Sequence, residues 1–240
     1  MRTKYSLLSV LLFSMMSTSC RPQDMLSVRI VGAPQATSVE NQALHLLSEE
    51  AGARTGFEWQ LSSKPALSQS PAVELTIVAA LSSQVPALLP PGLREKWLRS
   101  SLPSPGGKLP EGFTVRRLGS EKAPIVVISG NDSRGLLYGV GYLLRKLSMG
   151  HGHVSLPQTL DVSTAPQYPV RSHQIGYRFK NNTYDGWTLA MFEQHIRDLA
   201  VFGISGLQII APHSDDAISS PLEQASNRTP EKSITAGDEQ

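Results

Sequence analysis

Short apolar runs and alternating apolar and polar positions divide the first part of the chain into candidate strands. Continuous β-branched runs are typical of buried strands, and alternation is typical of strands buried on one face. The run Ile125-Val126-Val127-Ile128 predicts that the strand containing it is the most deeply buried. Strands are predicted over residues 27–31, 57–61, 73–80, 112–118 and 123–129.

Two longer helices are predicted among these strands. Residues 43–50 carry one apolar face ahead of Gly52, a residue type that often ends a helix. The second helix is expected to begin after Asp132, a good N-cap, and to end by Gly150. A shorter helix is predicted over residues 93–98. Strands interleaved with helices predict a small α/β sandwich. The apolar stripe of the second helix consists of Leu136, Leu137, Val140, Leu143, Leu144 and Leu147.

The composition changes after this second helix. A Gly- and Pro-containing segment is expected to form loops, and a strand, a helix and a strand then follow with the length of one βαβ unit. Polar, aperiodic sequence after that unit predicts a disordered tail. Glu193 and Arg197 have the i, i+4 spacing of an ion pair within the helix. The segments are residues 151–169 (loop), 170–177 (strand), 188–202 (helix), 207–211 (strand) and 214–240 (tail).

The first twenty residues have the features of an export signal. Arg2 and Lys4 precede an apolar run, Leu7–Met16, which is shorter than the roughly 20 residues that span a membrane. Cys20, the only cysteine, follows three small residues and resembles the lipobox cysteine of bacterial lipoproteins. We therefore expect an exported lipoprotein, periplasmic or at the outer membrane or cell surface, held to the membrane by a lipid anchor at Cys20. The alternative is a plain secretory signal with an incidental cysteine.

Charge and motif content narrow the range of partners. Outside the signal the acidic and basic residues balance, and no basic cluster indicates a nucleic acid partner. The six histidines and single cysteine show no metal-site spacing, so no metal is predicted. Gly130, Gly135 and Gly139 do not match a dinucleotide fingerprint or a phosphate loop, so no cofactor is expected. These glycines are instead expected to serve a turn and close helix–sheet packing.

The stretch Gly130-Asn131-Asp132-Ser133-Arg134-Gly135-Leu136-Leu137-Tyr138-Gly139-Val140 carries an Arg-Gly…Tyr-Gly pattern behind an N-cap aspartate. It resembles the accessory domain that precedes the catalytic barrel in bacterial β-N-acetylhexosaminidases of glycoside hydrolase family 20. It also resembles the corresponding domain of α-glucuronidases of the family 67 and 115 types. Glu111-Gly112-Phe113 and the buried strand match the same pattern. The resemblance extends over about residues 27–160 and is strongest over 111–147.

A second match, Pro169-Val170-Arg171-Ser172-His173-Gln174-Ile175-Gly176-Tyr177, resembles the first strand of the TIM barrel in these enzymes. The helix and strand after it resemble the first barrel helix and the second barrel strand. The resemblance implies an α/β fold, namely a small α/β sandwich accessory domain followed by the first βαβ unit of an incomplete TIM barrel. The implied boundaries are 1–20 (signal), 21–165 (accessory domain), 166–213 (start of the barrel) and 214–240 (tail).

Arg171 and His173 are the first candidates for substrate binding. Alternation places them on one face of the strand, and TIM-barrel active sites lie at the C-terminal ends of strands. By resemblance, Arg171 matches the first-strand arginine that binds sugar hydroxyls in hexosaminidases. A guanidinium offers fork-shaped donors to a polyol or a carboxylate. The alternative is a structural arginine at the floor of the barrel.

Four further residues are expected in loops above the barrel strands. Asp185 and Trp187 fall in the first such loop, where Trp187 would be either a platform for a sugar ring or an anchor of the loop to the core. His213 and Asp215 follow the second strand and are predicted to contact substrate. Asp215 and Asp216 are adjacent, and adjacent acids seldom meet the separation of roughly 5–9.5 Å between glycosidase carboxylates.

The resemblance implies a glycoside hydrolase that acts on polysaccharide-derived glycans. In those families the catalytic carboxylates lie on later strands, so no catalytic residue is assigned and the chain alone is expected to be inactive. Two of the eight barrel strands are predicted here. The alternative is a non-catalytic cell-surface module that binds carbohydrate or protein.

Overall fold

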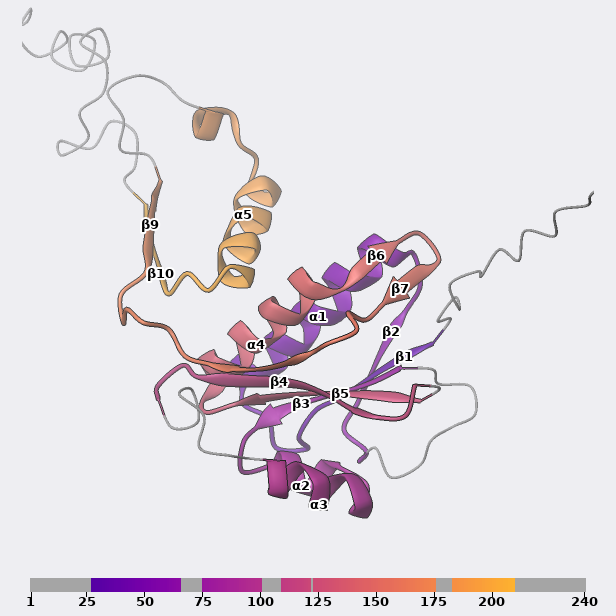
Figure 1. The fold of residues 1–240 in the computed structure, drawn as a ribbon. Coiled ribbons are helices and arrows are strands. Elements are labelled where there is room, and N and C mark those ends of the chain that lie inside the picture. Colours follow the sequence, from indigo (N-terminus) through magenta and orange to yellow (C-terminus); the bar gives the residue numbers. More distant parts are fainter. Residues whose placement is uncertain (1–26, 66–74, 101–108, 122, 176–182, 210–240) are drawn as a thin grey trace, which may run out of the picture.

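The computed structural model describes residues 27–65, 75–100, 109–121, 123–175 and 183–209. They form an α/β domain (residues 27–164) followed by a strand–helix–strand unit (residues 172–209), called the βαβ unit below (Figure 1). The α/β domain consists of β1 (Val28–Val31), α1 (Ser38–Thr55), β2 (Trp59–Ser62), β3 (Leu75–Leu81), α2 (Val85–Leu88), α3 (Pro91–Ser100), β4 (Phe113–Gly119), β5 (Pro124–Gly130), α4 (Ser133–Lys146), β6 (Ser148–Gly150), β7 (His153–Ser155) and β8 (Asp161–Thr164). The βαβ unit consists of β9 (Ser172–Ile175), the short 3₁₀ helix η1 (Thr183–Gly186), α5 (Leu189–Val201) and β10 (Gly206–Ile209).

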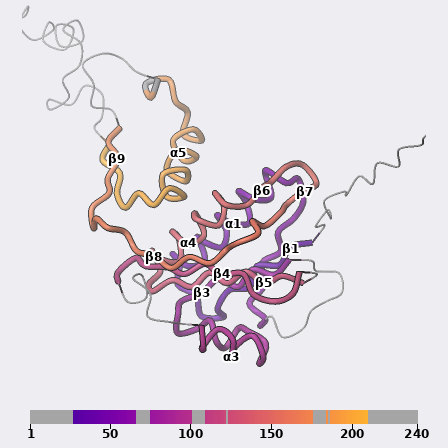
Figure 2. Tube along the Cα trace, viewed as in Figure 1, coloured from indigo at the N-terminus to yellow at the C-terminus, as the bar shows by residue number. Residues whose placement is uncertain are grey.

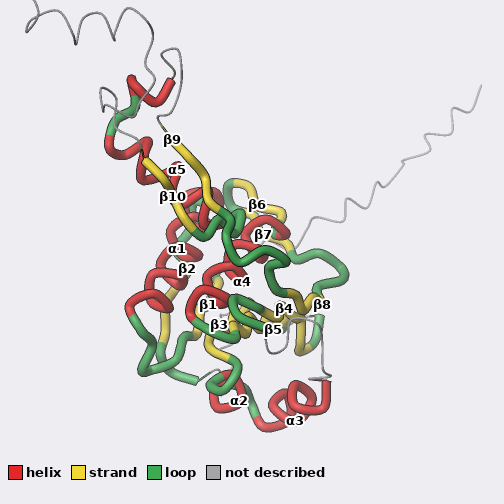
Figure 3. The backbone as a smooth tube through the Cα atoms, turned by 90° about the vertical axis from the view of Figure 1, so that its left-hand side faces the viewer, coloured by secondary structure: helices red, strands yellow, loops and turns green. Residues whose placement is uncertain are grey.

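A six-stranded sheet in the order β2-β1-β3-β5-β4-β8 forms the centre of the α/β domain. β2, β1, β3 and β5 are parallel, whereas β4 runs antiparallel to both β5 and β8. All seven residues of β5 are buried, which confirms the expectation from its apolar run. Helices α1 and α4 cover one face of the sheet, and α2 and α3 cover the other (Figure 3). The predicted α/β sandwich is therefore confirmed.

Alternation along β5 divides the core into two layers. Val126 and Ile128 pack toward α1 and α4, whereas Ile125 and Val127 pack toward α2 and α3. A strand buried on both faces needs apolar residues at every position, and this requirement explains why β5 has no polar alternation.

The starts of α1 and α4 are tied together by one buried carboxylate. The Thr37 hydroxyl caps α1 by accepting from the Glu40 backbone N–H, and the Glu40 carboxylate accepts from the Thr37 backbone N–H in return. Ser133, at the start of α4, donates its hydroxyl to Glu40 Oε1 at 2.7 Å. Glu40 is only 2% exposed, so these hydrogen bonds offset the cost of burying its charge.

Glycines let α4 approach the sheet closely. A Cβ added at Gly135 would lie 2.3 Å from the Gly112 carbonyl oxygen, and one added at Gly139 would lie 2.7 Å from Ile128 Cγ2. Asp132 caps α4 by accepting from the Gly135 N–H at 2.7 Å. The structure confirms that these glycines serve close packing.

One expectation about the α/β domain was wrong, and one short helix was not predicted. Residues 151–169 are not all loop, because β7 pairs with β6 and β8 pairs with β4 at the edge of the sheet. The Thr114 hydroxyl donates to Ser163 Oγ at 2.9 Å, which supports the β4–β8 pair across a long separation in sequence. Glycine and proline residues indicate local turns, but they do not predict whether a segment pairs with a strand that is distant in sequence. The four-residue helix α2 was also missed, since it is too short to show a helical stripe.

The predicted strand–helix–strand after the α/β domain is confirmed. β9 and β10 pair in parallel, with Ser172 opposite Gly206, and α5 begins at the N-cap Thr188. The unit lies on the side of the sheet that α1 and α4 cover, away from α3 (Figure 2). Among the described residues no helix has the length and apolar character to cross a membrane. The predicted signal at 1–20 and tail at 214–240 lie outside the described residues.

Replacing Gly135 with Ala is expected to lower the free energy of unfolding by roughly 2–3 kcal/mol, because the added methyl would overlap backbone atoms of Gly112 that cannot rotate away. Gly92→Ala in α3 is the control, since no atom lies within 4 Å of a Cβ there. The control should leave the free energy of unfolding unchanged or raise it by about 0.5–1 kcal/mol. Urea unfolding followed by circular dichroism measures both, and equal midpoints for the two variants would contradict the close packing of α4.

Candidate functional site

The structure describes the side chains of three of the predicted site residues. Arg171 lies directly before β9, His173 lies within β9, and Trp187 lies between η1 and α5. Asp185 belongs to η1, but its side chain lies outside the described part of the chain, as do His213, Asp215 and Cys20.

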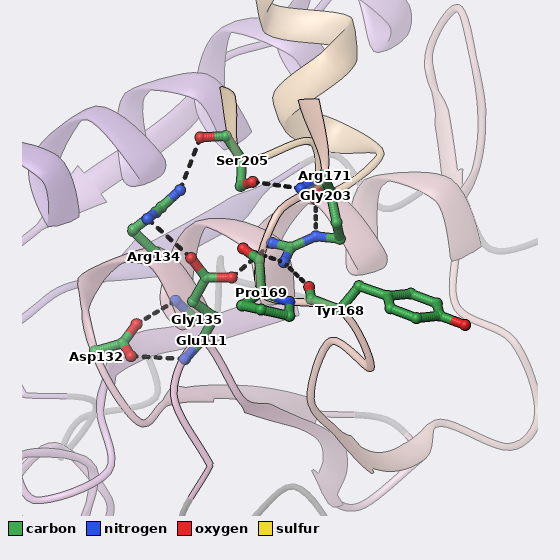
Figure 4. Close-up of polar contacts among 9 residues, drawn as sticks. All are labelled: Glu111, Asp132, Arg134, Gly135, Tyr168, Pro169, Arg171, Gly203 and Ser205. Atoms are coloured by element: carbon green, nitrogen blue, oxygen red, sulfur yellow. Dashed lines mark hydrogen bonds and ion pairs between the residues drawn. The ribbon is translucent and has the colours of Figure 1, made fainter. Parts of the chain in front are cut away.

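Arg171 connects the βαβ unit to the α/β domain. Its Nη2 donates to Glu111 Oε2 at 2.6 Å, its Nε donates to the Gly203 carbonyl at 2.7 Å and its Nη1 donates to the Tyr168 carbonyl at 2.6 Å (Figure 4). The guanidinium also lies over the Tyr138 ring, 5.1 Å from its centroid. Arg171 precedes β9, so this guanidinium is at the end of the strand opposite to its C-terminal end. These contacts favour the structural alternative for Arg171.

Glu111 is the centre of that connection. Its carboxylate, 12% exposed, pairs with Arg171 at 2.6 Å and with Arg134 of α4 at 2.9 Å. We call these three residues the Glu111 joint. Glu111 is the one non-glycine residue with a positive φ (59°) in the described part of the chain, and its N–H donates to Asp132 Oδ2 at 2.7 Å. A strained backbone of this kind persists where the surrounding contacts hold it.

The Glu111 joint also binds Ser205, the residue directly before β10. Arg134 Nη2 donates to the Ser205 carbonyl at 2.8 Å, and the Ser205 hydroxyl accepts from the Arg171 N–H at 2.9 Å. The starts of both strands of the βαβ unit are therefore fixed to the same cluster of charged groups. Glu111 and Arg134 both belong to the sequence motif described above, but the motif alone does not show that they pair.

Helix α5 has a second set of contacts with the α/β domain. Arg197 donates to Glu49 Oε2 at 2.5 Å, and Gln194 donates to Glu50 Oε1 at 3.1 Å. The hydrogen bond that Arg197 donates to the Glu49 carboxylate raises the pKa of Arg197 above its ordinary value. The close ion pair of Arg197 is with Glu49 of α1 and not with the predicted i, i+4 partner Glu193, whose negative charge still contributes to raising the pKa of Arg197.

His173 faces α5. Its ring lies 5.3 Å from that of His195 on α5, with the planes at 65°, and His195 also contacts the rings of Tyr184 and Trp187. The Nε2 atoms of both histidines are buried without a hydrogen-bond partner. Trp187 packs against Tyr184 and Phe192, as expected for an anchor of its loop.

The opposite face of β9 and β10 carries different side chains. Ser172, Gln174 and Gln208 are exposed, whereas Ile175 on the α5 side is 2% exposed. None of the eight residues of the two strands is Asp, Glu, Lys or Arg. No cluster of three or more potential metal-ligating side chains occurs in the part of the chain that the structure describes.

Comparison with known proteins gives the fold and not the activity. No family model and no curated protein matches the chain. A solved family GH115 4-O-methyl-α-glucuronidase with specificity for decorated arabinogalactans is similar over 76% of this chain and 25% of its own, with a TM-score of 0.50 and 14% identity. A mutant β-hexosaminidase of Streptomyces plicatus in complex with GlcNAc is similar over 77% of this chain and 30% of its own, with a TM-score of 0.46 and 11% identity.

A further neighbour is a GH138 enzyme that targets pectin rhamnogalacturonan II, with a TM-score of 0.46, 16% identity and coverage of 78% of this chain and 19% of its own. The chain thus spans 19% to 30% of the length of these proteins. The GH115 similarity shows that the chain has an α/β fold like part of a glycoside hydrolase.

Replacing Glu111 with Gln is expected to lower the free energy of unfolding by about 2 kcal/mol, because it leaves two guanidinium groups without their shared carboxylate. Glu95→Gln is the matched control: its ion pair with Arg99 is exposed, and the change should cost less than about 0.5 kcal/mol. Glu111→Gly relieves the backbone at φ 59° but should not restore stability. Urea unfolding of the three variants distinguishes these effects, and a Glu111→Gln variant as stable as Glu95→Gln would contradict the role of the joint.

Proposed function

We propose that the chain is the N-terminal part of an exported glycoside hydrolase that acts on polysaccharide-derived glycans. In this proposal the α/β domain is the accessory domain, and β9, α5 and β10 are the first strand, first helix and second strand of a TIM barrel. The single observation that carries the proposal is the parallel β9–α5–β10 unit fixed to an α/β domain, because the GH115 structure has a similar fold over 76% of this chain.

The uncovered face and the exposed apolar residues of the βαβ unit support this proposal. Parallel strands normally lie within larger sheets that are covered on both faces. Here α5 covers one face, and among the described residues the other face and the outer edge of β10 have no neighbour. Ile209 is 61% exposed and Leu189 is 76% exposed, and further strands and helices of a barrel would cover such residues.

Catalysis would need groups beyond those described. Glycosidases use two carboxylates on either side of the scissile bond, and β9 and β10 carry none. Asp185, His213 and Asp215 remain proposed contacts to substrate, with Trp187 in the same loop as Asp185. His173 is not among the proposed contacts, because its ring faces α5 and not the uncovered face of the strands.

Glycan contact is expected at the βαβ unit. Hydrogen–deuterium exchange of the whole chain with glucuronoxylan and chitin oligosaccharides should show protection of peptides that contain β9 and β10, since ligands of TIM barrels bind at strand ends. The same preparation should release no product from aryl glycosides. Protection confined to residues 28–164 would instead favour a non-catalytic carbohydrate-binding module. Turnover of aryl glycosides would contradict the expectation that this chain alone is inactive.

Export and anchoring are a separate part of the proposal. If the thiol of Cys20 carries a lipid, Cys20→Ser expressed in a bacterial host should move the protein from the membrane fraction to the soluble fraction and abolish incorporation of labelled fatty acid. Ser19→Ala, which keeps a small residue before the cysteine, is the control and should fractionate like the unaltered chain. Unchanged fractionation and labelling of Cys20→Ser would leave the plain secretory signal as the explanation.

A further inference from the structure

Two glutamines lie side by side on the uncovered face of the βαβ unit. Gln174 of β9 is opposite Gln208 of β10 in the parallel register, and both are exposed. Their neighbour His173 contacts His195 of α5, so alternation directs Gln174 away from α5. In-register residues of paired strands share a face, so Gln208 is directed the same way.

We infer that Gln174 and Gln208 form a carboxamide pair that binds the hydroxyl groups of a neutral sugar unit. The inference rests on the proposed function, because it takes β9 and β10 as the first two strands of a barrel whose inner face meets a glycan. Each carboxamide offers two N–H donors and one carbonyl acceptor. Adjacent strands lie about 4.8 Å apart, so the two groups can contact neighbouring hydroxyls of one ring.

The charge of this face selects the class of ligand. None of the eight residues of β9 and β10 is Asp, Glu, Lys or Arg, and the guanidinium of Arg171 is held by Glu111 at the other end of β9. The described part of this face offers no lysine or arginine to the carboxylate of an acidic sugar. Neutral donors and acceptors match the hydroxyls of a neutral pyranose.

The polar character of the pair also needs an explanation in a completed barrel. The interior of a TIM barrel is filled mainly by branched apolar side chains. Two carboxamides on that face would be costly unless hydrogen-bonded, and a bound glycan supplies the partners. The sequence analysis did not find this pair, because it placed Arg171 and His173 on the face toward the substrate. The contact of His173 with His195 of α5 shows that the face with Gln174 is the uncovered one.

The test is a titration of the full ¹⁵N-labelled chain with xylobiose and with methyl β-D-galactopyranoside, followed by NMR. The side-chain NH₂ signals of Gln174 and Gln208, identified by their loss in Gln174→Leu and Gln208→Leu, should shift saturably with sugar. Each variant should weaken binding about fivefold through the loss of its hydrogen bonds. Gln60→Leu on the exposed strand β2 is the matched control and should bind like the unaltered chain.

The outcomes separate this inference from the proposed function. If backbone amides of β9 and β10 shift while both leucine variants bind like the unaltered chain, the pair is overturned and the proposed function stands. If no signal shifts saturably at the highest soluble sugar concentration, the pair is overturned, because both carboxamides are already exposed and in place. If shifts are confined to the α/β domain, both the pair and the proposed function are overturned.

Discussion

The shared pairing of the Glu111 carboxylate with two guanidinium groups determines how the two parts of the molecule are joined. Arg134 belongs to α4 and Arg171 to the segment before β9, so one acidic side chain connects the α/β domain to the βαβ unit. The positive φ of Glu111 costs about 1–2 kcal/mol for a residue with a Cβ. Hydrogen bonds to charged groups contribute about 1.5–3 kcal/mol each, which is enough to offset that strain.

The position of the Glu111 joint explains which face of the βαβ unit is uncovered. Arg171 precedes β9 and Ser205 precedes β10, so both strands begin at the joint and run away from it. Helix α5 is held on α1 by Arg197 and packs closely on α4, where a Cβ at Gly141 would lie 2.4 Å from the Val201 carbonyl oxygen. One face of the two strands is thereby covered, while the other face and the strand ends are directed away from the α/β domain.

Local patterns predicted most of the elements, and contacts between distant residues decided the rest. The stripe of α4, the buried run of β5 and the N-cap Asp132 are periodic or short-range features, so the sequence predicts them. The role of Arg171 depends on Glu111, 60 residues away, and the face of His173 depends on His195. The alternation of side chains predicts that Arg171 and His173 lie on the same face of the strand, but it does not predict which face α5 covers. The Glu111-Gly112 turn was visible as part of a motif, yet no spacing rule indicates a positive φ at a glutamate.

Residual dipolar couplings of the backbone amides test most directly whether the α/β domain and the βαβ unit form one rigid body through the Glu111 joint. The account predicts that couplings from β5 and α4 and couplings from β9, α5 and β10 fit a single alignment tensor computed on the structure. Two tensors of different magnitude or orientation would contradict it, since they would mean that the βαβ unit moves independently of the domain that carries Glu111.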